Sequence, residues 1–341
     1  MIVVAGEALI DLLPTADRDG QPALRPAIGG SPLNVALGLG RLGRRTAFLG
    51  AVSTDAFGAQ IMAALQDSRV DTALVMRVAR PTPLAVASLS GGEARYAFYD
   101  AGTASRGMTL RELAPHPVDA TWLHFGSIAL AAEPAASTLI ARAKTVARST
   151  QSPCLVSYDP NVRPDFATDE APYRRNLDQA MEVADLIKLS HADLAWMRPG
   201  ITADGFAREQ IVRGASLVVV TRGNEGAEAF TRQHGFAVPA PQVEVADTIG
   251  AGDAFMAGLL CALDEAHVRT RTVLAALPKK ALLDAISFAA CVAAVTCSKQ
   301  GAVMPWREEL QASPSAHARA SGHPGQESLD SRLRGNERSE K

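Results

Sequence analysis

The sequence DTIGAGDAF at 247–255 combines two closely spaced glycines with an aspartate at the start of an apolar run. Gly250 and Gly252 lack a Cβ atom, so the backbone there can approach a ligand closely. The apolar run predicts a helix, and the unpaired N–H groups and dipole at a helix N-terminus favour an anion. Asp253 then has two alternative roles. It either caps the helix, or takes a proton from a hydroxyl while the N–H groups hold charge on a phosphoryl group.

The segment IGGSPLNVA at 28–36 places two glycines before a second predicted helix. Pro32 fits the first turn of that helix, where its missing N–H costs nothing. Gly29 and Gly30 would allow close backbone approach to a ligand, and Asn34 would present an amide to hydroxyl groups. The alternative is a tight turn between a strand and a helix, which needs such glycines in any case.

Two further motifs, YDPNVRP at 158–164 and VVVTRGNEGA at 218–227, follow predicted strands. The first favours a ligand site over a solvated turn with a surface ion pair. The second suits a nucleotide phosphate or ribose, or an ordinary turn into a hairpin. The residues concerned are Asp159, Pro160, Asn161 and Arg163, and Thr221, Arg222 and Gly223.

The segment GLGRLG at 38–43 fits the dinucleotide pattern GxGxxG, but it lies inside a helical apolar pattern instead of directly after a strand. An acidic residue ending a following strand is also missing at the expected distance. We therefore expect these glycines to let the helix pack closely on the sheet. The phosphate loop GxxxxGK[ST] is absent from the sequence.

Strands alternating with helices are needed to position these motifs. Residues 2–5 predict a buried strand that brings Glu7 and Asp11 to its end. Further strands are expected at 46–53, 122–128, 154–160, 186–190 and 216–223, and helices at 57–68, 134–149, 170–184 and 202–213. This order predicts an α/β fold with a parallel sheet covered on both faces, whose ligands lie beyond the carboxyl ends of the strands.

Other segments predict hairpins and long helices. Residues 14–27 indicate a loop or small hairpin. Residues 83–101 alternate like exposed antiparallel strands around a turn at Gly91-Gly92, and 226–240 predicts a second hairpin. Two long apolar helices are expected at 253–263 and 279–297.

Composition narrows the functional class. The 341 residues carry 34 basic and 36 acidic side chains, a net charge of −2, which argues against binding to nucleic acid or to a membrane surface. Four scattered cysteines without a CxxC pair are typical of free thiols in a reducing cytosol. Acidic residues precede any basic one at the N-terminus, unlike a signal peptide, and the apolar stretch 285–298 is too short to span a bilayer. We expect a cytoplasmic protein.

The motifs together resemble a known family. GEALIDLLP, GGSPLNVALGLGRLG, DPNVRP, VTRGNEGA and DTIGAGDAF occur in the order found in the ribokinase-like (PfkB) carbohydrate kinases, and the resemblance covers residues 2–311. With YAFYDAGTASR at 96–106, the chain is most similar to the bacterial fructokinases of that family. The resemblance implies a three-layer α/β/α sandwich over 1–311, with a mainly parallel sheet and a small β-sheet lid from about 8–27 and 83–101. The tail at 312–341 would be disordered.

The activity implied by the resemblance is transfer of a phosphoryl group from Mg-ATP to a sugar hydroxyl, with D-fructose converted to fructose 6-phosphate. Asp253 would be the catalytic base, and the N–H groups of Gly250, Ala251 and Gly252 would form the anion hole. The sugar would be bound by Asp11, Gly29, Gly30, Asn34, Phe98, Arg106 and Arg163. The nucleotide would be contacted by Lys188, Thr221, Gly223, Gly226 and Gly252.

Ion sites are also implied by the resemblance. The family's NxxE element, which organises the magnesium shell, is replaced here by SHAD, with Ser190 and Asp193; an aspartate reaches less far, so water would mediate the contact. Asp247, Ile249 and Gly301 would surround a monovalent cation, with potassium as the candidate. The lid sheets of this family often pair, which would make the chain a homodimer.

Several alternatives stay open from the sequence. The nearest alternative activity is that of a 2-keto-3-deoxygluconate kinase, because the acid group of that sugar would suit Arg163. A ribose or nucleoside kinase is a more distant alternative. A nicotinamide-dependent oxidoreductase would rest on GLGRLG alone. A non-catalytic sugar-binding protein is disfavoured, because the predicted base and anion hole are both present.

The C-terminal tail gives a first test. It is rich in Ser, Arg, Gly and His and has no counterpart in the family fold, so it should not contribute to a core. Removing residues 316–341 is therefore expected to leave turnover unchanged in a steady-state assay. A large loss of turnover in the shortened chain would contradict this expectation.

Overall fold

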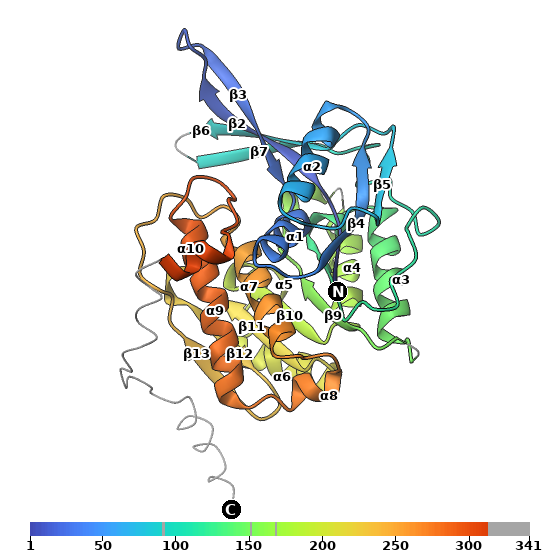
Figure 1. Cartoon of the computed structure of the whole chain (residues 1–341), viewed down its shortest axis with the longest axis vertical. Coiled ribbons are helices and arrows are strands. Elements are labelled where there is room, and N and C mark those ends of the chain that lie inside the picture. The colour runs from blue at the N-terminus through green and yellow to red at the C-terminus, as the bar shows by residue number, and fades with distance from the viewer. Residues whose placement is uncertain (91–92, 151, 168, 313–341) are drawn as a thin grey trace, which may run out of the picture.

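A nine-stranded sheet runs through the large part of the molecule in the order β13-β12-β11-β10-β9-β8-β1-β4-β5 (Figure 1). The structure is a computed structural model that describes residues 1–90, 93–150, 152–167 and 169–312. Neighbouring strands from β5 to β11 are parallel, and the last two pairs are antiparallel. The strands are β1 (Ile2–Ala5), β4 (Thr46–Ser53), β5 (Val75–Val78), β8 (Trp122–Gly126), β9 (Leu155–Asp159), β10 (Leu186–Ser190), β11 (Leu217–Thr221), β12 (Ala227–Phe230) and β13 (Gly235–Val238).

Helices cover both faces of this sheet, because the strands are apolar on both sides. Ile2 and Val4 of β1 lie in one core cluster, and Val3 and Ala5 lie in the other. This alternation follows from the two-residue period of a strand. The first cluster includes residues of α1 (Ser31–Arg41), α2 (Ala56–Asp67), α7 (Ala251–Glu265), α8 (Arg271–Ala275) and α9 (Lys279–Cys297). The second includes residues of α3 (Ala135–Ala147), α4 (Glu170–Met181), α5 (His191–Met197) and α6 (Ala203–Arg213). The predicted three-layer α/β/α arrangement is confirmed.

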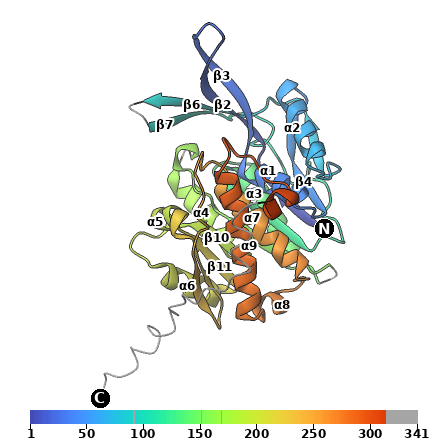
Figure 2. The same ribbon diagram turned by 60° about the vertical axis from the view of Figure 1, so that its left-hand side comes forward.

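A second, four-stranded sheet stands at one end of the molecule, as Figures 1 and 2 both show. Its strands are β2 (Leu9–Ala16), β3 (Pro22–Gly29), β6 (Leu84–Ser90) and β7 (Glu93–Tyr99), in the order β3-β2-β6-β7. The segment 14–27 is thus a hairpin and not a loop. Asp11 lies within β2, opposite Ala27 of β3, and not at the end of β1 as expected. The predicted turn at Gly91-Gly92 lies outside the described residues.

The sheet order places a topological switch point between β1 and β8. The chain leaves β1 for β4 and β5 on one side, and the strands from β8 to β13 extend on the other side. Ligands of open α/β sheets bind in the crevice beyond the carboxyl ends of the strands at such a point. The carboxyl end of β1 is followed by Glu7, that of β8 is Gly126, and that of β9 is Asp159. This edge is therefore where the candidate site should lie.

The C-terminal part of the fold is largely helical. Within the described residues, α9 alone is long and apolar enough to cross a membrane by length and composition, with a mean hydropathy of 1.7. The helix is longer than the stretch 285–298 considered from sequence. It packs against α7, and residues such as Ile286 and Val292 are fully buried in the core. A helix buried in a protein core satisfies the same criterion of length and composition, and α9 is such a helix. The short α10 (Arg307–Ala312) ends at the first residue of the predicted tail, and 313–341 lie outside the described residues.

Gly38 and Gly40 of GLGRLG lie against α7 and the end of α2 and not against the sheet, which corrects the expectation from sequence. Gly43 follows α1 and has open space where a side chain would lie. A Cβ atom on Gly38 would lie 2.8 Å from the Cβ atom of Ala257 in α7. A Cβ atom on Gly40 would collide with the carbonyl of Ser68 at the end of α2. Both glycines are buried inside α1 and offer no loop to a dinucleotide. This removes the only support for a nicotinamide cofactor.

The packing of α1 on α7 can be tested with Gly38→Ala. Overpacking a buried contact costs about 1–3 kcal/mol, more than the roughly 1 kcal/mol that alanine gains over glycine in a helix. The free energy of unfolding measured in urea should therefore fall. Gly205→Ala in α6 is the matched control, because its new Cβ would meet only side-chain atoms at 3.1 Å or more. Equal stability of the two variants would contradict the close contact.

Candidate active site

The motif DTIGAGDAF forms the N-terminus of α7. Gly250 is the N-cap residue and adopts the left-handed conformation, with φ of 78°, which favours glycine. A Cβ atom there would also lie 2.7 Å from the Cβ atom of Ala302. The first N–H groups of a helix have no carbonyl partner within the helix. Ala251 is an exception to the predicted anion hole, because its N–H donates to the carbonyl of Thr248 at 3.2 Å. Gly250 and Gly252 are left as the better N–H donors.

Asp253 does not cap its own helix, which excludes the first of its two alternative roles. The α7 N-terminus has no side-chain cap, and the carboxylate of Asp253 turns to α1. Ser31 Oγ donates to its Oδ1 at 2.6 Å, and Asn34 Nδ2 donates to its Oδ2 at 2.8 Å. All three side chains are buried. The two glycine-containing motifs, more than 200 residues apart in sequence, thus meet through one carboxylate.

Burial raises the pKa of the Asp253 carboxyl above its ordinary value, although the hydrogen bonds from Ser31 and Asn34 act in the opposite direction. The positive charge of Lys188 also lowers this pKa, and the charge of Asp159 raises it. A carboxylate with a raised pKa is a stronger proton acceptor when it is ionised. The environment of Asp253 therefore suits a general base.

A buried ion pair lies next to the start of α7. Lys188 Nζ of β10 donates to Asp159 Oδ2 at the end of β9 over 2.7 Å, and each side chain is less than 5% exposed. Burial alone would lower the pKa of the Lys188 ammonium, but the neighbouring Asp159 raises it above its usual range. A Cβ atom on Gly252 would lie 3.1 Å from Nζ. The predicted nucleotide contact Lys188 is thus a buried positive charge behind the anion hole.

The loop that follows β9 carries the DPNVRP residues to the same edge. Asp193 orders this loop: its Oδ1 accepts the N–H of Val162 at 2.8 Å, and its Oδ2 accepts the N–H and hydroxyl of Ser190. Both oxygens are therefore engaged in holding the backbone and the start of α5. Its contact with a magnesium shell stays a prediction. Arg163 is exposed, and its guanidinium donates to the carbonyl of Val162.

Phe98 brings the small sheet to this loop. Its ring, in β7, packs on Phe166 just after the DPNVRP segment, with 3.3 Å between the ring centroids. Phe98 therefore brings the small sheet against the segment that follows Arg163.

A cleft of about 340 Å³ opens between the small sheet, the helices α1 and α2, and the loops that carry Ile249 and Gly301. Asp11, Asn34 and Ile28 line it from one side, and Ile249 and Gly301 line it from the other. Pockets that bind small ligands have volumes of this order. Burial, with the nearby charge of Asp253, raises the pKa of Asp11 to about 6. The cleft therefore joins the predicted sugar residues to the loop before α7.

Gly29 and Gly30 let the end of β3 approach its neighbours. A Cβ atom on Gly29 would collide with the carboxylate of Asp11. Gly30 has φ of 109°, and a Cβ atom there would lie 2.8 Å from the carbonyl oxygen of Glu7. Both positions need the absence of a side chain, which keeps α1 close to the end of β1.

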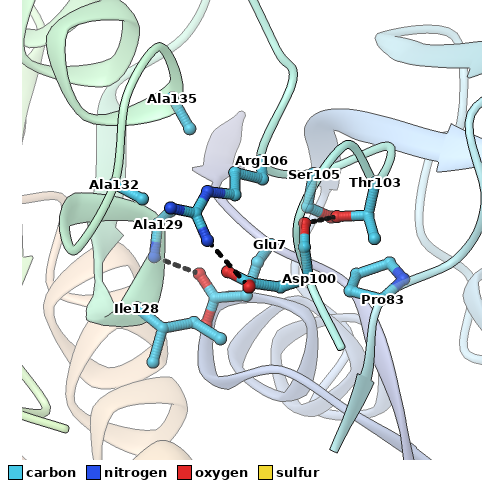
Figure 3. A pocket seen from close by; sticks show the side chains of 10 residues that line it. All are labelled: Glu7, Pro83, Asp100, Thr103, Ser105, Arg106, Ile128, Ala129, Ala132 and Ala135. Atoms are coloured by element: carbon cyan, nitrogen blue, oxygen red, sulfur yellow. Dashed lines mark hydrogen bonds and ion pairs between the residues drawn. The ribbon is translucent and has the colours of Figure 1, made fainter. Parts of the chain in front are cut away.

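Arg106 lies apart from the cleft that Asp11 and Asn34 line. It lines a second, small pocket, where its Nη1 donates to Asp100 Oδ1 at 2.8 Å (Figure 3). Glu7 projects into the same pocket, accepts the N–H of Ala129 at 3.3 Å, and has a pKa raised to about 7 by burial. The structure therefore places Arg106 in an ion pair with Asp100, in a pocket that it shares with the buried carboxyl of Glu7. Its role in sugar binding stays a prediction.

The predicted nucleotide and cation residues lie on neighbouring segments. Thr221 ends β11 beside Ser190 of β10, and Gly223 and Gly226 bound the turn that leads to β12. Asp247 ties two loops together, because its carboxylate accepts the N–H of Ile249 at 3.0 Å and that of Gly301 at 2.8 Å.

The sequence pattern did not reveal the partners of three residues that define this geometry, although it did place Asp159 in a predicted ligand site. Ser31 looked like part of a helix start, yet its hydroxyl bonds to a residue 222 positions away. Asp159 was noted in a strand-end motif without its lysine partner. Glu7 was noted only as following a strand. The pairing of Asp159 with Lys188 could have been predicted once the strand order was known, because the strand that ends in Asp159 lies beside the strand that carries Lys188.

The buried ion pair gives a stability test. Lys188→Met leaves Asp159 buried without a partner, which should lower the free energy of unfolding by about 3–5 kcal/mol in urea denaturation. Replacing both, with Lys188→Met and Asp159→Leu, should recover much of that loss without restoring turnover. Lys280→Met is the control, because Lys280 and Asp284 are both exposed and the pair is worth less than about 1 kcal/mol. Full stability of Lys188→Met would refute the pairing.

Comparisons with known proteins agree with this architecture. Residues 1–309 match the family model described as pfkB family carbohydrate kinase. The fructokinase of Rhizobium leguminosarum bv. trifolii is 38% identical over 282 residues, which cover 83% of this chain and 85% of that protein.

Two solved structures are similar over nearly the whole chain. The fructokinase from Xylella fastidiosa with bound ATP has a TM-score of 0.84 and 27% identity, and covers 94% of this chain and 99% of its own. The Vibrio cholerae O395 fructokinase in its fructose-, ADP- and calcium-bound form has a TM-score of 0.77 and 28% identity. The match covers 91% of this chain and 97% of that protein. The chain therefore belongs to the pfkB family of carbohydrate kinases.

Proposed function

We propose that this protein is an ATP-dependent fructokinase, which transfers the terminal phosphoryl group of ATP to the 6-hydroxyl of D-fructose to give fructose 6-phosphate and ADP. The observation that carries the proposal is the buried carboxylate of Asp253 at the N-terminus of α7, held by two donors from α1. The similar proteins that are named fructokinases support the choice of sugar.

In this proposal Asp253 is the catalytic base. The sugar hydroxyl donates its proton to the carboxylate as its oxygen attacks the phosphorus of the terminal phosphoryl group, and ADP leaves. Such transfers depend on positioning and on stabilising the charge of the phosphoryl oxygens more than on covalent chemistry. The bonds from Ser31 and Asn34 fix the carboxylate before the substrate arrives.

The start of α7 would hold the transferred group. The N–H groups of Gly250 and Gly252 and the helix dipole favour its negative charge. Ala251 would join them only by exchanging its bond to Thr248. Lys188, next to Gly252, adds a buried positive charge that acts at short range in a site from which water is excluded. We assign Lys188 this role in place of a surface contact with the nucleotide.

The sugar would lie in the cleft below the small sheet. Asn34 Oδ1 is buried without a hydrogen-bond partner, while the amide nitrogen is bound to Asp253. A buried acceptor left unpaired is costly, so a hydroxyl of the sugar is a fitting donor to it. Asp11 lines this cleft, and Gly29 and Gly30 lie beside it, against Asp11 and Glu7. Phe98 and Arg163 would complete the sugar site from the small sheet and from the loop after β9. Arg106 is the weakest member of the proposed sugar set.

The small sheet would act as a lid over the bound sugar. Closing it excludes water, which otherwise competes with the sugar as acceptor of the phosphoryl group. We propose that residues 1–311 work as one kinase unit in which this sheet is the moving part. Leu24 and Tyr99, on its two outer strands, are 47% and 63% exposed. These apolar side chains on sheet edges support pairing of two lids in a homodimer.

Thr221, Gly223, Gly226 and Gly252 would contact the nucleotide. Thr221, Gly223 and Gly226 lie at and just after the carboxyl end of β11, and Gly252 lies in the first turn of α7. Magnesium would arrive with the ATP phosphates, since Mg²⁺ keeps several waters and is bound through few carboxylates. We propose that Asp193 contacts this magnesium ion through a water molecule. Asp247, Ile249 and Gly301, tied together by two hydrogen bonds, are the proposed neighbours of a potassium ion.

We place the reaction in the cytoplasm. ATP and hexoses are available there, and the four cysteines are all free, with Cys154 and Cys261 buried.

The base can be tested with Asp253→Asn. The amide keeps the shape of the side chain but cannot take the proton, so turnover should fall by about 10²- to 10⁴-fold while sugar binding is largely kept. Initial rates of ADP release and sugar affinity by calorimetry give the two readouts. Near-normal turnover would reject Asp253 as the base.

The sugar can be tested by ADP release with fructose, 2-keto-3-deoxygluconate, ribose, mannose and adenosine, each with and without potassium. We expect the highest kcat/KM with fructose. The acid sugar is the main competitor, because the exposed Arg163 guanidinium would suit its carboxylate. A preference for 2-keto-3-deoxygluconate of tenfold or more would replace fructose in the proposal and leave the phosphoryl transfer in place.

A further inference from the structure

The base is held by two donors that differ in what else they can do. Ser31 Oγ donates to Asp253 Oδ1 at 2.6 Å, and Asn34 Nδ2 donates to Oδ2 at 2.8 Å. Both come from the first turn of α1, and both are at most 7% exposed. Asn34 has a second polar atom, Oδ1, which is buried without a described hydrogen-bond partner, and the residue lines the cleft proposed for the sugar. Ser31 has one hydroxyl proton, and it is committed to the carboxylate.

The backbone around Ser31 is held on both sides. Gly30 adopts φ of 109° directly against the carbonyl of Glu7. Pro32, the next residue, packs on Gly6, where a Cβ atom would collide with the proline ring. The Ser31 hydroxyl does not cap α1, whose N-cap is Gly30 and which has no side-chain cap. The serine therefore stabilises no helix end, and its one described partner is the carboxylate of α7.

We infer that Ser31 is a positioning residue for the phosphoryl-transfer reaction: its hydroxyl fixes the orientation of the Asp253 carboxylate. The inference rests on the proposed function, because it assumes that Asp253 is the base. Asn34 can also accept a hydrogen bond from the sugar through its Oδ1 atom. Within the described part of the chain, the Ser31 hydroxyl has only the carboxylate as its partner, so it would hold the carboxylate in place throughout the reaction cycle.

The charged groups around the carboxylate determine how its ionisation responds to Ser31. Lys188 from β10 favours the ionised form, and Asp159 from β9 opposes it. Asp253 in turn raises the pKa of Glu7, at the end of β1, and of Asp11, in β2. Ser31 is a neutral donor among these charges, and its hydrogen bond lowers the pKa of Asp253. Removing it should raise that pKa, so that a higher pH is needed to ionise the base.

The test uses the full chain with Ser31→Ala, assayed for ADP release with fructose over a range of pH. A hydrogen bond to a charged group is worth enough that its loss should lower kcat by about 10- to 100-fold. The KM for fructose should change little, and the acidic limb of the kcat profile should move to higher pH. Ser31→Thr keeps the hydroxyl and should recover most of the activity. Ser31→Cys, of similar size but a weaker donor, should fall between the two.

Ser68→Ala is the matched control, because Ser68 is fully buried and accepts a bond from Arg41 at the other end of α1. It should leave the pH profile unchanged. Rates are normalised to the folded fraction from urea unfolding, so a loss of stability is not counted as a loss of positioning. A wild-type kcat and acidic limb in Ser31→Ala would overturn the inference, as would an equal shift in Ser68→Ala.

Failure of the inference and failure of the proposed function give different results. If Ser31→Ala is unaffected while Asp253→Asn is inactive, the base stands and only the role of Ser31 is rejected. If Asp253→Asn keeps wild-type turnover, the base itself is rejected, and the inference falls with it.

Discussion

Burying a carboxylate costs free energy unless its oxygens are hydrogen-bonded and its charge is balanced, and the arrangement around Asp253 follows from that constraint. One helix brings the carboxylate, a second helix brings two donors, and the central sheet brings the buried Lys188 ammonium. None of these elements could shift far without leaving a buried charge unpaired. The close packing of α1 on α7, which needs glycine at position 38, keeps donors and acceptor within reach of each other.

The same constraint orders the second charge in the site. Lys188 and Asp159 come from adjacent strands and neutralise each other at the edge where ligands of such sheets bind. The neighbouring carboxyls respond to this environment: burial raises the pKa of Glu7 to about 7 and that of Asp11 to about 6. In the proposed mechanism, an anionic phosphoryl group would be met by N–H groups and by one shielded cation. This explains how a chain with a net charge of −2 can serve an anionic substrate without a basic surface.

Much of the fold could be predicted from local pattern. The β-branched strands, the glycine and proline at the start of α1, and the alternating segments of the small sheet have periods and turn residues that act over a few positions.

Contacts between distant segments could not be predicted in this way. Gly38 was expected against the sheet but meets α7, because apolar periodicity shows which face is buried and not what covers it. Asp11 was expected at the end of β1, yet the chain enters β2 before reaching it. The Asp253 carboxylate could cap a helix or act as a base until its partners from α1 were known. The pairing of Arg106 with Asp100 likewise could not be predicted from the sequence, and a role for Arg106 in sugar binding stays a prediction.

The 222-residue separation between Ser31 and Asp253 has a consequence for how the protein is made. A ribosome synthesises the chain from its N-terminus, so α1 and the first strands of the sheet leave it long before α7 does. Until then the donors of α1 face no carboxylate, and the cleft lacks the residues that we propose as its base and its anion hole. A nascent or prematurely ended chain that still folds its first strands is therefore unable to consume ATP. The competence to react arises only when the last third of the chain has docked, which links synthesis of the catalytic centre to completion of the core.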